Sequence, residues 1–353
     1  MASEILCGYC GTPNQPKESF CEKCGGELNV VPLPPPAPLP VPTLLNQRYR
    51  VLNKLGEGGF GTVYKVQDTQ LNNRLLAAKK LELNNIPPKD HQDAINNFKQ
   101  EANILASLRH PNLPHIYEHF VENSDYYLVM DFIEGETLEH HLQGLKSPVM
   151  PIEKTVKLCT QLANVLEYLH ARQPQIIFRD LKPANIMFTS SSEVYLIDFG
   201  IARHFKPGQA RDTVRMGTLE YIAPEQLSGK QTSVSSDIYS FGVVLHELLS
   251  GNVPVYPPQF ALLKLAGAPQ ASLSKLVMSM LEREPQSRPA SAAEVKRQLQ
   301  QIQQDLQHST SSSRAQSQPA AKSALPTRVL PKASAPKKPL PPPLPKTRGE
   351  LLH

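Results

Sequence analysis

The sequence predicts an α+β fold in which a strand-rich segment precedes a helix-rich one. Mixed or continuous apolar runs of strand length occur at 49–55, 62–66, 75–79 and 126–133. Further along, apolar residues recur every three or four positions from Val156 to Leu169 and again from Val295 to Leu306, as on amphipathic helices. A run of strands followed by a run of helices indicates an α+β architecture.

Composition divides the 353 residues into four parts. Residues 1–31 hold four of the five cysteines, and residues 32–46 are rich in proline. Residues 47–307 carry the regular patterns, and an apolar content of 40% is enough for a core. Residues 308–353 consist largely of Ser, Ala, Pro and Lys without periodicity, which predicts a disordered tail.

Charge and targeting signals exclude some classes of protein. The formal net charge is +5, but residues 309–353 hold eight Lys or Arg against one Glu, which leaves the rest slightly acidic. No globular part therefore needs a nucleic-acid partner on grounds of charge. No run of 18 apolar residues occurs, and the first residues lack the basic and apolar regions of a secretory signal. We expect a cytoplasmic protein.

The N-terminal cysteines form two C-x-x-C pairs, Cys7 with Cys10 and Cys21 with Cys24. In a reducing compartment such pairs indicate a metal site, and four thiolates suit a structural Zn²⁺ without an open position. A segment of about 30 residues cannot bury a core, so the metal would supply the folding energy. The segment resembles the zinc ribbons of prokaryotic proteins. A redox pair and a disulfide staple are the alternatives.

Two segments are dense in proline. Pro32–Pro42 predicts a semi-rigid polyproline II rod of about 3.1 Å per residue. We expect a spacer between the ribbon and the globular part, with a ligand for a proline-reading domain as the alternative. Pro339–Lys346 in the tail has P-x-x-P character beside a basic residue and offers the same alternative.

The stretch Ile176–Met187 carries the residues from which a reaction can be inferred. Asp180 can accept a proton from a hydroxyl, Lys182 can neutralise a phosphoryl oxygen, and Asn185 can hold a metal ion. Asp198-Phe-Gly follows in the sequence. Together these segments resemble the catalytic and metal-binding loops of the eukaryotic-like serine/threonine protein kinases, which many bacteria carry.

A glycine-rich turn supports this resemblance. Gly56, Gly58 and Gly61 allow backbone N–H groups to approach phosphate oxygens closely. A strand at 62–66 follows the glycines where a dinucleotide-binding fold would have a helix. This order favours the glycine-rich loop of kinases.

The next strand supplies a candidate lysine. Leu75–Lys79 resembles the V-A-x-K strand of kinases, in which the lysine holds the α- and β-phosphates. Lys79 fits the register best, and Lys80 is the alternative. Glu101 lies in a predicted helix and resembles the glutamate that pairs with this lysine, because the segment 108–113 after it fixes the register.

The resemblance covers residues 48–307 and implies a bilobal kinase fold, with an antiparallel sheet plus one helix and then a mainly helical lobe. It implies ATP-dependent phosphoryl transfer to serine or threonine of protein substrates, with autophosphorylation, and ATP, Mg²⁺ or Mn²⁺ as cofactors. Asn185 and Asp198 would hold the Mg²⁺. The residues that it places around the nucleotide are Leu55, Gly56, Gly58, Gly61, Val63, Ala77, Lys79, Met130 (as gatekeeper), Ile133 and Met187.

Further positions bear on regulation and specificity. Residues 178–180 read Phe-Arg-Asp where the family has H-R-D, and we expect little loss of chemistry from this change. Arg179 would pair with a phosphate on Thr213, the candidate regulatory site, although Thr213 as a plain polar loop residue is an equal alternative. Thr218 resembles the threonine that contacts the catalytic aspartate, and with Lys182 it favours Ser/Thr acceptors.

Five residues carry structural expectations. Cys159 should be a buried small hydrophobe, and His170 a packed residue at a helix end. Asp237 resembles the family aspartate that fixes the backbone of the catalytic loop. Arg288 should pair with Glu225.

Three other functions compete with a protein kinase. A pseudokinase scaffold would act through its ribbon and tail, but Lys79, Asp180, Asn185 and Asp198 are all retained. A nucleic-acid-binding regulator would act through a ribbon that has few basic and aromatic residues. A small-molecule kinase is disfavoured by the segment 217–225, which in the family binds protein substrates.

Overall fold

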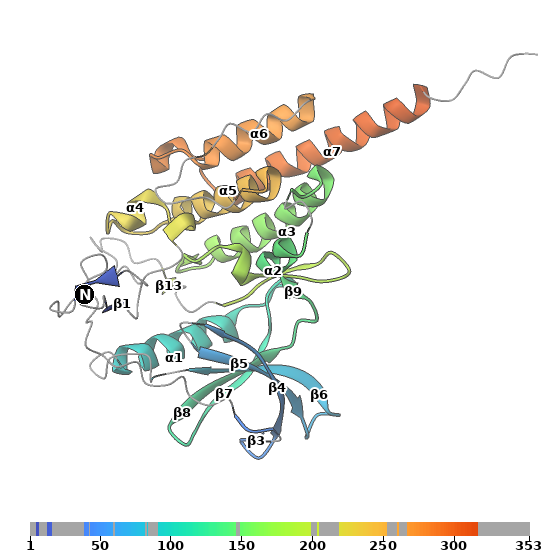
Figure 1. The fold of residues 1–353 in the computed structure, drawn as a ribbon. Helices are drawn as coiled ribbons and strands as arrows, with labels where there is room; N and C mark the ends of the chain where they lie inside the picture. The colour runs from blue at the N-terminus through green and yellow to red at the C-terminus, as the bar shows by residue number, and fades with distance from the viewer. Residues whose placement is uncertain are drawn as a thin grey trace, which may run out of the picture. The chain divides into compact units, whose positions relative to one another are not determined.

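A computed structural model of the chain describes residues 5–6, 13–15, 39–41, 43–58, 61–81, 83, 91–145, 149–198, 203–204, 219–252, 260 and 267–316. The chain divides into two units, Met1–Ser309 and Thr310–His353. The first unit holds every strand that the structure describes (Figure 1). Within the described ranges, no helix is both long and apolar enough to cross a membrane.

The first half of this unit is a six-stranded antiparallel sheet with the order β3-β4-β5-β6-β8-β7. Short connections join most sequential strands, as expected for antiparallel pairing. Helix α1 (His91–Ser107) lies between β6 and β7 in the sequence and packs on one face of the sheet (Figure 1). The strands are β3 (Leu44–Leu45), β4 (Tyr49–Gly58), β5 (Gly61–Asp68), β6 (Arg74–Leu81), β7 (Ile116–Glu122) and β8 (Asp125–Asp131).

The sheet is apolar on both faces. Leu128 on β8 joins the core that contains Phe98 and Ala102 of α1. Its neighbours Tyr127 and Val129 belong to a second apolar cluster on the opposite, outer face. Alternation along the strand therefore separates two cores.

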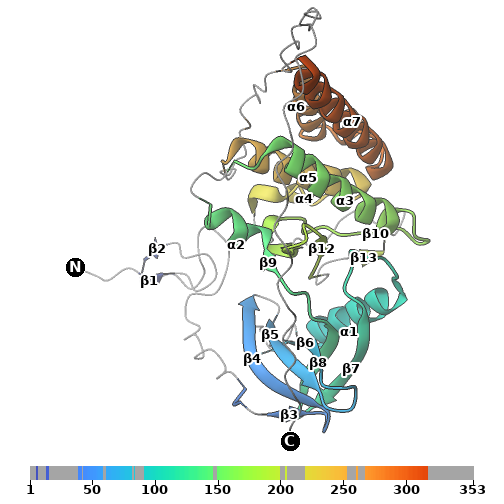
Figure 2. The same ribbon diagram turned by 90° about the vertical axis from the view of Figure 1, so that its right-hand side faces the viewer.

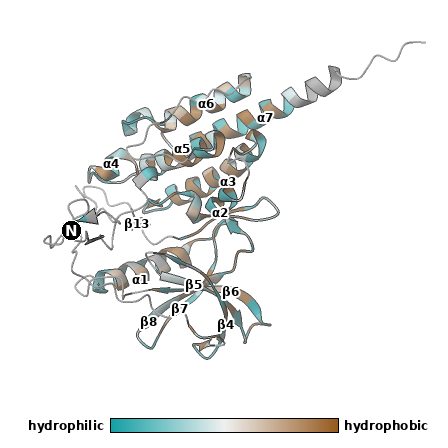
Figure 3. Cartoon of the chain, viewed as in Figure 1, coloured by the Kyte–Doolittle hydropathy of each residue, from teal (hydrophilic) through white to brown (hydrophobic). Residues whose placement is uncertain are grey.

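The second half is helical. Helix α5 is buried on all sides from Ser236 to Leu249 and contacts both α3 and α6, and apolar residues recur along α3 and α5 (Figure 3). Cys159 on α3 is fully buried, as expected, and burial raises the pKa of its thiol. The helices are α2 (Leu138–Gln143), α3 (Ile152–His170), α4 (Pro224–Leu227), α5 (Val234–Ser250), α6 (Ala268–Met280) and α7 (Ala292–Gln316).

Short strands lie between the six-stranded sheet and α3 (Figure 1, Figure 2). They form a three-stranded sheet of order β12-β11-β9 and a separate pair of β10 with β13. A further pair, β1 (Ile5–Leu6) with β2 (Pro13–Asn14), lies near the N-terminus of the sequence. The others are β9 (Glu136–Thr137), β10 (Ile176–Ile177), β11 (Ile186–Phe188), β12 (Val194–Leu196) and β13 (Arg203–His204).

Regular structure is present beyond both expected limits of the patterned region, 47 and 307. Strand β3 lies inside the segment 32–46 that we expected to be a spacer, and it pairs with β4 through a turn in which Asn46 and Gln47 have φ of 48° and 51°. A two-residue strand is too short to show a period, and the turn lacks the Asn-Gly signal. At the other end, α7 continues to Gln316 because an established helix propagates at low cost.

The expected pair of Arg288 with Glu225 is confirmed. The Arg288 Nη1 and Nη2 atoms lie 2.7 and 2.9 Å from Glu225 Oε1 and Oε2, and both side chains are buried. Burial by itself would raise the pKa of Glu225, but hydrogen bonds from Arg288 and Ser236 hold it below its ordinary value. This pair ties α4 to the segment before α7.

Breaking this ion pair should destabilise the fold. Arg288→Met leaves the Glu225 carboxylate buried without a cation, and we expect the free energy of unfolding at pH 7 to fall by about 3–5 kcal/mol. Unfolding in urea measures this free energy. The control is Arg74→Met, because the Arg74 side chain is 50% exposed where it meets Asp131; it should cost less than about 1 kcal/mol. Equal costs for the two variants would contradict the assignment.

Candidate functional site

Two of the predicted side chains converge on a third, the carboxylate of Asp180, between β10 and β11. The Nδ2 atom of Asn185 donates to the backbone carbonyl of Asp180 at 2.8 Å and to its Oδ2 at 2.9 Å. Lys182 Nζ lies 3.0 Å from the same Oδ2. A 3₁₀ turn at Pro183–Asn185 brings these residues together, closed by the Asn185 N–H donating to the Lys182 carbonyl at 3.0 Å.

The backbone just before this group is held by Asp237 at the start of α5. Its fully buried carboxylate accepts the N–H groups of Phe178 and Arg179, each at 2.8 Å. His170 at the end of α3 places Nε2 2.8 Å from the same carboxylate. Arg179 has a φ of 74°, which costs energy in a non-glycine residue and persists only where the surroundings fix it. The expectations for Asp237 and for a packed His170 are confirmed.

A β-hairpin brings Asn185 and Asp198 to the same place. Strands β11 and β12 pair with Ile186 opposite Leu196, and the Ile197 N–H donates to the Asn185 carbonyl at 2.9 Å. Asp198 follows directly with a φ of 63°. The two residues predicted to bind a metal thus lie at the same end of one hairpin.

Strand β6 contributes Lys79 to the group. Its Nζ lies 2.6 Å from Asp198 Oδ1, and its side chain is 7% exposed. Lys80 points to the opposite face of the sheet, where its Nζ lies 2.8 Å from Asp125 Oδ2. Of the two registers that the sequence allows, only that of Lys79 places the ammonium group beside Asp198.

The donor set fits a hard divalent cation. Asn185 uses Nδ2 for its bonds to Asp180, so its carbonyl Oδ1 is the atom that remains for a metal ion. An amide oxygen and the Asp198 carboxylate are oxygen ligands of the type that Mg²⁺ prefers. The residues present therefore suit Mg²⁺.

Several residues predicted to line a nucleotide share one face of the sheet. Val63 pairs with Lys79, and Ala77 pairs with Met130, so alternation places all four on the same face. Leu55 lies on β4 at 44% exposure, close to an irregularity of strand pairing.

The other two residues in the predicted nucleotide set lie beyond the six-stranded sheet. Ile133 follows β8, and Met187 lies on β11 opposite Thr137. Both are half-buried.

Glycine is required at two positions around this face. Gly61 has a φ of 144°, and a Cβ there would lie 2.0 Å from the Lys80 carbonyl oxygen. Gly135 follows Ile133, and its Cβ would lie 2.5 Å from the Phe188 carbonyl oxygen. Only glycine allows these close backbone approaches. Gly56 and Gly58 lie at the end of β4, where Gly58 pairs with Gly61 at the start of β5.

Other predicted residues lie outside the described part of the chain, so their roles remain predictions. They are the four N-terminal cysteines (Cys7, Cys10, Cys21 and Cys24), the activation-segment threonines Thr213 and Thr218, and the side chain of Glu101, although its backbone belongs to α1. Among the described residues, no group of three or more His, Cys, Asp or Glu could hold a metal ion.

Sequence reasoning missed two contacts of the site. The Arg179 guanidinium donates to the Thr232 hydroxyl, and Thr232 is 4% exposed. The hydrogen bond from His170 to Asp237 was also not predicted. Each links residues more than 50 positions apart, and no local pattern marks such a pair.

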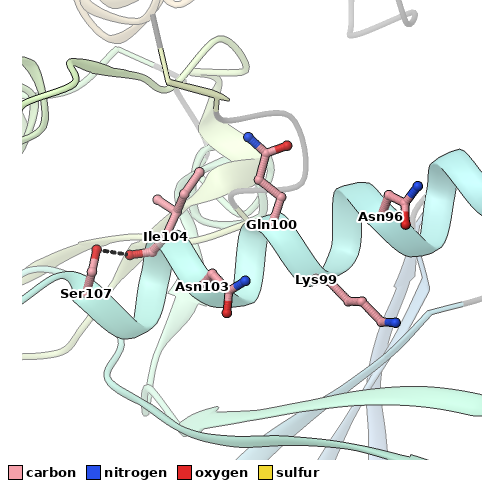
Figure 4. Close-up of a pocket in the computed structure, with 6 residues that line it drawn as sticks. All are labelled: Asn96, Lys99, Gln100, Asn103, Ile104 and Ser107. Carbon is pink, nitrogen blue, oxygen red and sulfur yellow. Dashed lines mark hydrogen bonds between the residues drawn. The ribbon is translucent and has the colours of Figure 1, made fainter.

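A hollow on α1 of about 420 Å³ lies apart from this group. Its lining residues belong to the helix, with Lys99 and Asn103 on one side and Gln100 and Ile104 on the other (Figure 4). It contains no carboxylate, histidine or cysteine among the residues described.

Comparison with known proteins identifies the family. The protein kinase domain family matches residues 49–323. This chain belongs to the protein kinase family. The match contains strands β4 to β8 of the sheet, the helices and all five residues of the group formed by Lys79, Asp180, Lys182, Asn185 and Asp198.

Named relatives come from several bacteria. The probable serine/threonine-protein kinase PknB of Lactococcus lactis is 36% identical over 208 residues, which cover 59% of this chain and 32% of the relative. PrkC of Bacillus subtilis is 35% identical over 211 residues, or 60% of this chain and 31% of the relative. Pkn2 of Myxococcus xanthus is 35% identical over 277 residues, which cover 71% of this chain and 32% of the relative. The matches span about a third of the length of these relatives.

The two adjacent lysines provide a matched test of the kinase site. Lys79→Met removes the ammonium group beside Asp198, and we expect phosphoryl transfer from ATP·Mg²⁺ to fall at least about 100-fold. Lys80→Met removes a partly exposed pair with Asp125 on the other face, so transfer should stay within about two-fold. The initial rate of phosphate incorporation measures both. A larger loss in Lys80→Met than in Lys79→Met would reverse the assignment.

Proposed function

We propose that this chain is an ATP-dependent protein kinase that transfers the γ-phosphoryl group to serine or threonine hydroxyls. The observation that carries the proposal is the contact of Lys79 with Asp198 next to the group of Asp180, Lys182 and Asn185. Phosphoryl transfer needs cations around the phosphates and a carboxylate at the acceptor hydroxyl. This group supplies both.

Each residue has a distinct task in this proposal. Asp180 orients the acceptor hydroxyl and takes its proton. Lys182, 3.0 Å from Asp180, offsets negative charge on the transferred group. Lys79 holds the α- and β-phosphates, while Asn185 and Asp198 hold Mg²⁺. When bound, Mg²⁺ would offset negative charge on the phosphates.

The nucleotide would lie against the Lys79 face of the sheet. Val63, Ala77 and Met130 share this face, and apolar side chains are what a flat base requires. Leu55, Ile133 and Met187 would complete the pocket. The backbone N–H groups of the turn from Gly56 through Gly58 to Gly61 would approach the phosphates.

The type of acceptor and the regulation of the kinase are proposed from a few further residues. Lys182 and Thr218 favour serine or threonine, in agreement with the relatives from Lactococcus lactis and Bacillus subtilis, which are named serine/threonine-protein kinases. We propose protein substrates, autophosphorylation and a lysine–glutamate pair of Lys79 with Glu101. A phosphate on Thr213 would compete with the Thr232 hydroxyl for Arg179.

The N-terminal region is proposed to be a zinc ribbon. The pairing of Ile5–Leu6 with Pro13–Asn14 supports it, because these strands stand on either side of Cys7 and Cys10 in the sequence. We also propose a cytoplasmic location, where a reducing environment keeps such thiolates from forming disulfides. Residues 317–353 are proposed to be a disordered tail that offers a proline motif to a partner.

The proposed function is tested by phosphate incorporation into the full chain. With ATP·Mg²⁺, intact-mass spectrometry should show added phosphate on the wild type and on a generic protein acceptor. Asp180→Asn keeps the size of the side chain but cannot take the proton, and should lower the rate by roughly 10²–10⁴-fold. Transfer at an equal rate in both proteins would exclude Asp180 as the base, and none in the wild type would count against kinase activity.

The zinc site is tested by metal content. Elemental analysis should find one zinc ion per chain in the wild type, and Cys7→Ser combined with Cys24→Ser should lose it because two thiolates are removed. Cys159→Ala is the matched control, since Cys159 is buried in α3. This control should keep the metal. A metal-free wild type, or zinc that persists in the double variant, would refute the ribbon.

A further inference from the structure

The outer face of the six-stranded sheet, away from α1, is unusually rich in aromatic side chains. Tyr49, Tyr64 and Tyr127 are at most 2% exposed, and Tyr117 and Phe120 pack against them. The Phe120 ring is stacked between Tyr49 and Tyr127, with ring centroids 6.0 and 5.1 Å apart. Nothing in the proposed chemistry uses this face.

The segment before β4 lies against this aromatic face. We name residues 39–41 and 43–45 the strap. Leu39 packs on the cluster, and its N–H donates to the Tyr64 hydroxyl at 3.3 Å. Leu45 is 3% exposed within the cluster. The Thr43 hydroxyl donates to the Pro40 carbonyl, which holds the strap in its turn.

The strap contacts both strands that lead into the glycine-rich turn. The Thr43 carbonyl accepts the N–H of Val51 at 2.8 Å, and Val51 precedes Gly56 on β4. Tyr64, which binds Leu39, follows Gly61 on β5. The β4–β5 pairing is irregular between Val51 and Asn53 and again between Lys54 and Gly56. Such irregularities disrupt the hydrogen bonds between β4 and β5 locally. The hydrogen bond from Val51 to the strap therefore holds β4 where its pairing with β5 is interrupted.

We propose that the outer face of the sheet is a docking surface for the chain's own proline-rich segment, and that docking of the strap holds β4 and β5 in the arrangement that binds nucleotide. An extended, proline-rich strand with a leucine anchor is the ligand that aromatic faces bind, because little conformational entropy is lost. Leu39, a described residue of the proline-rich segment Pro32–Pro42, packs on this face in the structure. On this proposal, the described residues 39–41 and 43–45 act as part of the kinase unit.

The test uses the full chain and two measurements. Hydrogen exchange at the Val51 amide reports docking, and the Kd for ATP·Mg²⁺ reports the nucleotide site. Leu39→Asp places a charge against the aromatic cluster, and should speed exchange at Val51 roughly ten-fold and weaken ATP·Mg²⁺ binding about five-fold. Tyr64→Phe removes one hydrogen-bond acceptor and should move both readouts in the same direction, by about two- to five-fold.

Val41→Asp is the matched control. It makes the same chemical change within the strap, but Val41 is 59% exposed, so both readouts should remain within about two-fold of the wild type. If Leu39→Asp and Tyr64→Phe give the same values as Val41→Asp, the docking proposal is overturned. Faster exchange at Val51 with an unchanged Kd would overturn the coupling to nucleotide.

The nucleotide readout rests on the proposed kinase function, whereas the exchange readout does not. A wild type that fails to bind ATP·Mg²⁺ would therefore count against the proposed function, while protection at Val51 would still decide the docking. Should Leu39→Asp fail to fold, Tyr64→Phe decides both questions, because it removes a single hydroxyl from a buried ring.

Discussion

The catalytic group depends on one buried carboxylate. Asp237 accepts hydrogen bonds from two successive backbone amides and from His170, and it is fully shielded from water. Such a carboxylate remains where it is because each of its donors would lose a charge-assisted bond if it moved. Arg179 can therefore keep its left-handed backbone conformation, and Asp180 follows it at a fixed place. The orientation of Asp180, the proposed base, is thus set by α5, a helix that is itself buried.

Charge balance explains how the remaining groups are positioned. Asp198 lies beside Lys79 and Asp180 beside Lys182, so each acid of the site has a cation within 3.0 Å. Asp180 precedes the β11–β12 hairpin in the sequence and Asp198 follows it, so the hairpin brings the two acids together. Lys79 comes from β6 of the six-stranded sheet. A nucleotide with its metal ion would lie among groups whose charges are already arranged, which is how preorganised sites lower a barrier.

Much of this arrangement could be predicted from the sequence, because motif spacing encodes local geometry. Lys79, Asp180, Lys182, Asn185 and Asp198 were each predicted, and the structure brings them together. The fold class and the pair of Arg288 with Glu225 were predicted as well. What the sequence did not reveal depends on tertiary contacts. Thr232 meets Arg179 across 53 positions, and β3 is two residues long, so neither leaves a periodic signal.

The proline-rich segment shows what composition alone leaves open. Proline predicts an extended chain, and an extended chain without partners is a spacer, but the same chain beside an aromatic face is a ligand. The partner lies in Tyr49, Tyr64 and Tyr127, which the sequence presents only as ordinary strand residues. Because every strand of a sheet has two faces, a residue docked on the outer face acts on the same backbone that carries Val63 and Lys79 on the inner one. The proposed nucleotide face and the aromatic face therefore share their strands, so a shift of this common backbone would reach both.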